Sequence, residues 1–254
     1  MGWVTLFSEH NVISFMLLLA RLSSIFLLVP IFSHNAIPAN IKAMMALFFT
    51  IIFYPQLPPL GFEVNITSVV IALLSEILFG IAVGIVLQLA FHIITYAGEI
   101  ISFMMGFSMA SAIDPQTGVS SPIMSQFLSL LAIMILLATD LHHWIILFCS
   151  HSLLSVPLGS LVLSSNYFQY IIHATSNMFL FGFMVAFPIT ALGLLSDVIF
   201  GMIMKTMPQF NLLVIGYPIK IALSLGVIIA ALSAIFLVLK AQISEAFSHL
   251  GLFF

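Results

Sequence analysis

Long apolar blocks, separated by short groups of turn-forming residues, dominate the pattern along the chain. The blocks cover residues 12–32, 41–54, 66–97, 123–138, 141–156, 170–195 and 212–239. A helix needs about 20 residues to cross a hydrocarbon core of about 30 Å. The blocks at 66–97 and 212–239 are longer than one crossing requires, whereas those at 41–54, 123–138 and 141–156 are short. The pattern therefore predicts an all-α protein, but it fits a set of uniform transmembrane rods badly.

Prolines and one aspartate account for the breaks in this pattern. Each proline removes a hydrogen-bond donor and fixes φ. Prolines lie in the connections on both sides of the block at 41–54, at positions 30, 38, 55, 58 and 59. Asp140 divides the stretch 123–156, which predicts two short antiparallel helices rather than one long helix. Pro188 and Pro218 lie inside apolar blocks, where we expect each to kink a helix.

Composition shows where the outside of the molecule must go. Hydrophobic residues make up 63% of the 254 residues and charged residues 5%, whereas an average soluble domain is about 25% charged. So few charged residues cannot cover the surface of a water-soluble globular protein. The surface must therefore be buried in lipid or in other subunits. A net charge of −3 is not that of a protein with a basic surface for binding nucleic acid. The single cysteine, Cys149, excludes an intrachain disulfide and a cysteine-based metal cluster.

Residues 98–122 read GEIISFMMGFSMASAIDPQTGVSSP, the most unusual segment of the chain. Glycines and small residues allow backbones to approach closely, and methionine fills irregular gaps without a fixed shape. This is the composition of a deformable stopper that could close a hole. The alternative is an ordinary loop between two membrane helices.

A ladder with a period of four residues lies on the block 66–97. It consists of Glu76, Gly80, Gly84, Gln88, His92 and Tyr96. Residues four apart are neighbours on a helix, so they form one ridge of small and polar groups, and the two glycines allow a close helix crossing. The favoured interpretation is packing against protein. The alternative is a proton or ion path through Glu76 and His92, which lie sixteen residues apart, too far for direct proton exchange.

Other polar residues in apolar surroundings give weaker signals. Arg21, Lys220 and Asp197 would be costly in hydrocarbon, so each is expected to be paired or to lie elsewhere. Asp140, His142, His143 and His151 are close in sequence, but they lack the zinc-binding spacing of two histidines four apart around a glutamate. We therefore predict a polar turn there, no metal and no cofactor. No pattern of catalytic residues is found, so no enzyme is expected.

Four ordered motifs resemble the FliR family, the R component of the flagellar type III protein export gate, called SctT in injectisomes. Arg21, Pro30, Pro38 and Lys42 reproduce its R-x8-P-x7-P-x3-K spacing. GEIISFMMGFSMASAIDP is similar to its GEIIGLQMG-type segment, LHHWIILF with VPLG resembles its G-H-L-W and LPIG segments, and MPQFNLLVIGYPIK resembles its M-P-Q…G-F-P motif. Leu141 and Gln126 depart from the family pattern, which leaves any special role of those positions or of His142 unsupported.

The resemblance implies a fold of kinked helical hairpins, with a P-subunit-like part at 1–165 and a Q-subunit-like part at 166–254. It implies assembly with P, Q and B subunits into a cone-shaped gate, through which unfolded proteins leave the cytoplasm, in the inner membrane at the flagellar basal body. The segment 98–122 corresponds to the channel plug, at Met104, Met105, Gly106, Phe107, Ser108, Met109, Ala110, Asp114, Pro115 and Gln116.

Residues expected to pack helices or subunits together are Arg21, Lys42, Glu76, Gly80, Gly84, Gln88, Glu99 and Lys220. The competing class is a proton-coupled secondary transporter or ion channel subunit in which Glu76, His92 and Asp114 relay protons.

Overall fold

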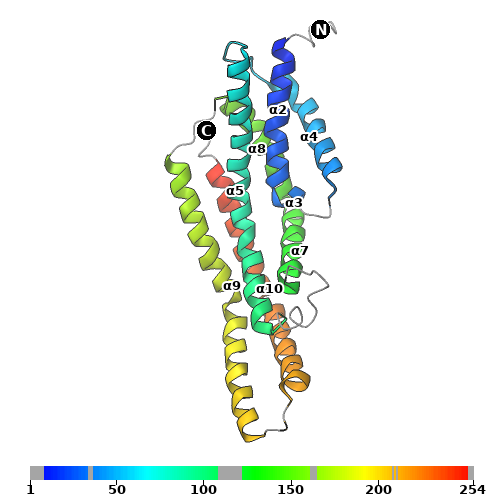
Figure 1. The fold of residues 1–254 in the computed structure, drawn as a ribbon, viewed down its shortest axis with the longest axis vertical. Helices are drawn as coiled ribbons and strands as arrows, with labels where there is room; N and C mark the ends of the chain where they lie inside the picture. Colours follow the sequence, from blue (N-terminus) through cyan, green and yellow to red (C-terminus); the bar gives the residue numbers. More distant parts are fainter. Residues whose placement is uncertain are drawn as a thin grey trace. The chain divides into compact units, whose positions relative to one another are not determined.

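A computed structural model describes residues 9–33, 37–107, 122–160, 165–207, 209 and 211–250 of the chain. Within these ranges every regular element is a helix, which confirms the predicted all-α class (Figure 1). The elements are α2 (Glu9–Leu28), α3 (Pro30–Ser33), α4 (Ala39–Phe53), the short η1 (Tyr54–Gln56), α5 (Ile66–Met105), α7 (Ile123–Ala138), α8 (Leu141–Ser155), α9 (Ser165–Thr206), the π-helical η3 (Leu212–Gly216) and α10 (Tyr217–His249).

Four helices in the described part of the chain are long and apolar enough to cross a membrane, and a fifth span is possible if α7 and α8 count as one bent span. Three of the long helices extend beyond the apolar blocks of the sequence. Helix α5 continues through residues 98–105, because Ala97, Ile101 and Met105 recur every four residues and are fully buried. The first part of the 98–122 segment is therefore helical and not a loop.

The predicted breaks have different outcomes. Asp140 separates α7 from α8 as expected, but the chain bends there by 68°, so the two helices are not antiparallel. Pro188 lies inside α9, which bends about halfway along its length (Figure 1). Pro218 lies in the first turn of α10, directly after the π-helical turn η3, and so does not kink the interior of a helix. A proline is tolerated there because the first helical turn needs few backbone donors.

The chain forms two compact units, each built from separate stretches of sequence. The first unit contains residues 1–89, 136–172 and 244–254. Its core is the buried face of α2, where Leu18, Leu22 and Ile25 are fully buried. Aromatic rings join the helices around it. Phe26 of α2 stacks on Phe49 of α4 with ring centroids 5.3 Å apart, and Phe79 of α5 stacks on Phe148 of α8 at 6.4 Å.

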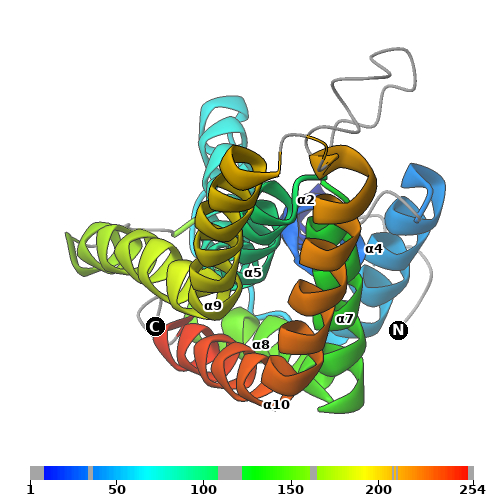
Figure 2. The same ribbon diagram turned by 90° about the horizontal axis from the view of Figure 1, so that it is seen from below.

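The second unit contains residues 90–135 and 173–243. It is built from the end of α5, most of α7, and most of the α9–α10 hairpin, which Figure 2 shows from below. A Cβ on Gly182 of α9 would lie 2.6 Å from the Tyr96 ring of α5, so these helices meet at a glycine. The resemblance found in the sequence implies a different division of the chain, into a P-subunit-like part at 1–165 and a Q-subunit-like part at 166–254. That division stays a prediction.

Candidate functional site

A buried ion pair between Arg21 of α2 and Glu76 of α5 lies at the centre of the first unit. Both side chains are only 1% exposed. Arg21 donates from Nε to Glu76 Oε2 and from Nη2 to Glu76 Oε1, the latter at 2.9 Å. Its Nη1 donates to the carbonyl oxygens of Ser152 and Val156 at 3.2 and 3.0 Å. One guanidinium therefore joins α2, α5 and the C-terminal end of α8, where backbone carbonyls and the helix dipole favour a cation.

The turn after α8 completes this ion-pair network. Gly159 donates its backbone N–H to Glu76 Oε1 at 2.6 Å and adopts a φ of +79°. A Cβ there would lie 2.9 Å from the Cβ of Ala72. A left-handed backbone pressed against a neighbouring helix requires glycine. The VPLG motif found in the sequence thus supplies both a carbonyl for Arg21 and an amide for Glu76.

The ridge on α5 lies against α2. A Cβ on Gly80 would overlap Ser24, and one on Gly84 would overlap Leu28. Gln88 Nε2 donates to the carbonyl oxygen of Leu28 at 3.0 Å. These contacts and the Arg21–Glu76 pair show that successive turns of α5 pack against successive turns of α2. The side chains of α2 fill the space that the glycines leave.

The last two members of the ridge lie in the second unit. His92 is exposed, and its Nδ1 lies 3.2 Å from the Oγ1 of Thr95. Tyr96 is half-buried and packs edge-on against Phe179, with ring centroids 5.2 Å apart. Glu76 is held by Arg21 and a backbone amide, and Asp114, the third member of the alternative proton relay, lies outside the described residues.

The 98–122 segment leaves α5 through a defined helix end. Gly106 has a φ of +85°; its N–H donates to Phe103 O and that of Phe107 to Ser102 O, both at 3.1 Å. This is the hydrogen-bond pattern of a Schellman motif, in which a left-handed glycine terminates a helix. A Cβ on Gly106 would lie 2.6 Å from the Tyr217 ring of α10. The helix therefore ends where the methionine-rich stretch begins.

Gly106→Ala is expected to lower the free energy of unfolding by about 1–3 kcal/mol, because alanine disfavours a positive φ and would also displace Tyr217. The matched control is Gly201→Ala on α9, where a Cβ meets open space and a helical glycine-to-alanine change typically gains about 0.5–1 kcal/mol. Thermal unfolding of both variants in detergent measures the difference. Equal stability of the two variants would contradict the assigned helix end.

The far end of the segment is held beside its beginning. Ser102 Oγ of α5 accepts a hydrogen bond from the Met124 N–H at the start of α7, at 3.1 Å. Ser125 Oγ donates to Thr95 O at 3.0 Å. A Cβ on Gly98 would lie 2.5 Å from Ser125 Cα, so the two backbones are in close contact. The chain therefore leaves α5 and enters α7 through two stems that are bonded to each other.

A pocket of about 460 Å³ adjoins the α5 end of the segment. Its lining is mainly apolar and includes one ion pair, between Lys220 Nζ of α10 and Asp197 Oδ1 of α9 at 2.6 Å. The Lys220 side chain is 6% exposed and that of Asp197 is 56% exposed. The lining residues are Phe103, Met104, Gly106, Leu194, Asp197, Phe200, Met204, Leu212, Tyr217 and Lys220.

The remaining predicted site residues fall into three groups. Met104, Met105, Gly106 and Phe107 are described, and Met104 and Gly106 line the pocket. Lys42 on α4 is half-buried, and Glu99 on α5 is exposed. The other predicted plug residues lie outside the described residues, namely Ser108, Met109, Ala110, Asp114, Pro115 and Gln116.

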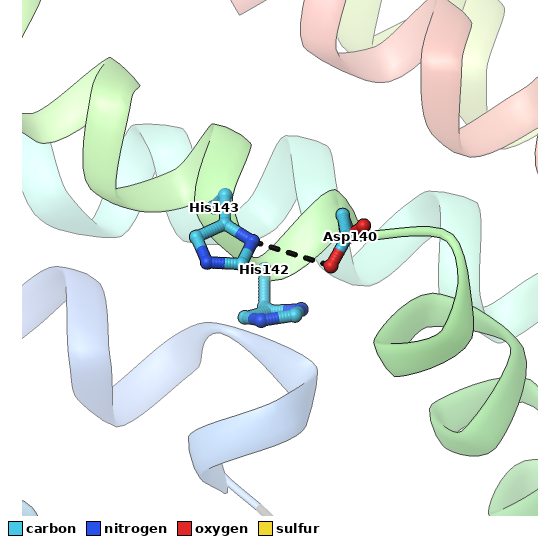
Figure 3. A group of neighbouring side chains, drawn as sticks. All are labelled: Asp140, His142 and His143. Carbon is cyan, nitrogen blue, oxygen red and sulfur yellow. Dashed lines mark ion pairs between the residues drawn. The ribbon is translucent and has the colours of Figure 1, made fainter.

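The turn between α7 and α8 brings Asp140, His142 and His143 together (Figure 3). Asp140 has a φ of 56°, and its Oδ1 lies 3.4 Å from His143 Nδ1. Adjacent side chains of an ideal helix point in different directions, whereas the structure places the ring centroids of His142 and His143 4.1 Å apart.

Sequence reasoning missed several partners in these sites. The serine and leucine of α2 that face the glycine ridge, the amide of Gly159 and the ring of Tyr217 carry no signal of their own in the pattern. Arg21 and Lys220 were expected to be paired, but only tertiary contacts identify Glu76 and Asp197 as their partners. The VPLG motif was the one available hint, since its glycine marks a special backbone position.

The fold and these sites define an all-α protein with several helices able to span a membrane and with charges neutralised by pairing inside the helical packing. Residues 12–246 match the family described as bacterial export proteins, family 1. The chain is 32% identical over 231 residues to the flagellar biosynthetic protein FliR of Bacillus subtilis strain 168, covering 89% of both chains.

It is 30% identical over 233 residues to the FliR protein of Escherichia coli K12, covering 92% of this chain and 89% of that protein. A third relative, from Pectobacterium carotovorum, is 31% identical over 196 residues, covering 77% of this chain and 75% of the relative. The chain therefore belongs to the FliR family of bacterial export proteins.

Proposed function

We propose that this chain is a core subunit of the flagellar type III export gate and that its 98–122 segment plugs the protein-conducting channel. The names of its relatives support the flagellar role. The observation that carries the plug proposal is the pair of bonded stems. The segment begins in the last two turns of α5, passes the Schellman end of that helix at Gly106 and finishes at α7, and the Ser102–Met124 and Gly98–Ser125 contacts hold its two ends together.

Bonded stems suit a plug because they fix the two points at which the segment is attached. The side chains between those points can then repack. Methionine and small residues tolerate repacking around varied polypeptides. Displacement of such a segment requires no catalytic group and no bound cofactor, which agrees with the expectation of a non-enzymatic protein.

The remaining parts of the proposal concern assembly and location. We assign the exposed apolar faces of the helices to P, Q and B subunits of the gate and to lipid of the inner membrane. Large apolar side chains are exposed along α4, including Met44, Phe48 and Ile51. Apolar surface of this extent is rarely left in water, so it needs a partner. Unfolded export substrates would pass through the assembled gate.

The plug is tested by replacing residues 109–118 with a Gly/Ser stretch of equal length, which leaves Gly106, Phe107 and both stems in place. We expect the assembled gate to conduct small ions well above the wild-type level, because the side chains that fill the channel are gone. Conductance of gates reconstituted in planar bilayers measures this, and co-purification of the partner subunits establishes that the variant gate has assembled.

Asp114→Asn is the matched control. It removes one carboxylate but keeps the volume of the segment, so the plug reading predicts an unchanged, closed gate and normal export. The proton-relay reading predicts that Asp114→Asn abolishes transport. A closed gate in the Gly/Ser variant would overturn the plug proposal.

A further inference from the structure

Three potential metal ligands meet at the turn between α7 and α8, outside the sites already described. One ligand atom from each of Asp140, His142 and His143 lies within 4.8 Å of the others. Figure 3 shows the Asp140 carboxylate directed at His143, with the His142 ring beside them. The three residues come from one turn of chain, which the left-handed Asp140 folds back on itself.

Two further observations show bonding capacity at these side chains that the described residues leave unused. The Nδ1 atom of His142 is buried and has no hydrogen-bond partner among the described residues. A buried polar atom without a partner in the protein is costly, so such an atom usually binds water or an ion. Asp140 occupies the N-cap position of α8, yet its side chain makes no capping hydrogen bond. Aspartate at this position normally accepts from the first backbone N–H groups.

The geometry points to a divalent transition-metal site formed by Asp140, His142 and His143. Two imidazoles and one carboxylate are ligands that suit Zn²⁺ and its neighbours in the first transition row, whereas Ca²⁺ and Mg²⁺ prefer all-oxygen sites. Three protein ligands leave the remaining coordination positions to water. This inference departs from the expectation of a metal-free turn, which rested on the missing zinc-binding spacing of two histidines four apart around a glutamate.

The ligand atoms need only a small contraction to bind a metal. Donors of a tetrahedral zinc ion lie roughly 3.3 Å apart, given metal–ligand distances of about 2.0–2.1 Å. The side chains of His143 and Asp140 are 61% and 75% exposed, so rotation about their side-chain bonds meets little obstruction. The metal would tie Asp140 to the first turn of α8 and so stiffen the bend between α7 and α8.

Metal binding is tested on the full-length chain in detergent, purified with an affinity tag that contains no histidine and stripped with a chelator. We expect the wild type to bind one equivalent of Zn²⁺, and Co²⁺ in its place to show the visible ligand-field bands of a cobalt ion bound to nitrogen and oxygen ligands. His143→Gln and Asp140→Asn are expected to weaken binding at least about tenfold, since even loss of an outer-shell partner typically costs 10–100-fold.

The variants are chosen to preserve the fold. His143 is exposed, and asparagine tolerates a left-handed backbone as aspartate does. His151→Gln is the matched control, because His151 is an exposed histidine on the same helix but outside the cluster. Unchanged Zn²⁺ affinity in His151→Gln supports the site. No binding by the wild type, or an equal loss in His151→Gln, would overturn it.

Discussion

Replacing Arg21 with alanine is expected to destabilise the first unit by about 3–5 kcal/mol, one of the two largest effects that the structure predicts. The change leaves the Glu76 carboxylate buried without its cation, and an uncompensated buried charge carries a penalty of this size. It also removes a donor to the carbonyl of Ser152, which keeps the N–H of Val156, and the donor to the carbonyl of Val156. Unfolding in detergent, followed by circular dichroism, measures the loss.

A second variant separates the charge effect from the loss of packing. The double change Arg21→Met with Glu76→Met removes both charges and keeps most of the volume, so it should recover part of the stability lost in Arg21→Ala. Recovery is expected to be incomplete, because the amide of Gly159 and the carbonyl of Val156 lose the partners that the ion pair gave them. Lys240→Ala removes an exposed cation on α10 and should change stability by less than about 0.5 kcal/mol. If Arg21→Ala were as mild as Lys240→Ala, the structural role of the ion pair would be refuted.

The other large effect is expected for Gly80→Val, which should force α2 and α5 apart. The new Cβ would overlap the Ser24 side chain and lie 2.9 Å from the backbone nitrogen of Ile25. Backbone cannot move aside as a flexible side chain can, so we expect at least the 1–3 kcal/mol that overpacking typically costs. The measured quantity is again the midpoint of unfolding.

Gly226→Val on α10 is the matched control, because a Cβ at Gly226 meets nothing within 4 Å. It carries the same intrinsic cost of a β-branched residue in a helix without the close contact. Gly80 lies one helical turn from Glu76, so separation of the helices also weakens the ion pair. The double variant Gly80→Val with Arg21→Ala should therefore lose less stability than the sum of the two single losses. Simple additivity would show that the close contact and the ion pair act independently.

The helices themselves follow from local pattern. Apolar runs predicted where helices lie, and the structure extends three of them because buried residues continue at helical spacing beyond each run. The boundary at residue 98 was wrong for this reason: glycine and glutamate interrupt the apolar run, but Gly98 is accommodated by close contact with Ser125 and Glu99 is exposed. The end of α5 depends on Gly106, whose left-handed backbone is a stronger stop signal than a change in polarity.

The cost of a charge in hydrocarbon predicted that Arg21 and Lys220 need partners, but it did not predict which residues those partners are. Partner choice depends on which helices pack together, and a sequence pattern carries no distances between helices. The same limit explains the histidines of α8. On an ideal helix adjacent side chains diverge, but the positive φ of Asp140 turns its carboxylate back toward His143.

By itself, the sequence determined that this protein is helical, that its surface must be covered by lipid or protein, and which residues are too polar to be left unpaired. These properties depend on composition and on periodicity along a single helix. The tertiary structure decided that Arg21 pairs with Glu76 and the turn after α8, that α2 fills the glycine ridge, and that the two stems of the 98–122 segment are bonded together. Those outcomes depend on contacts between residues far apart in sequence, and only the packing of the folded chain determines such contacts.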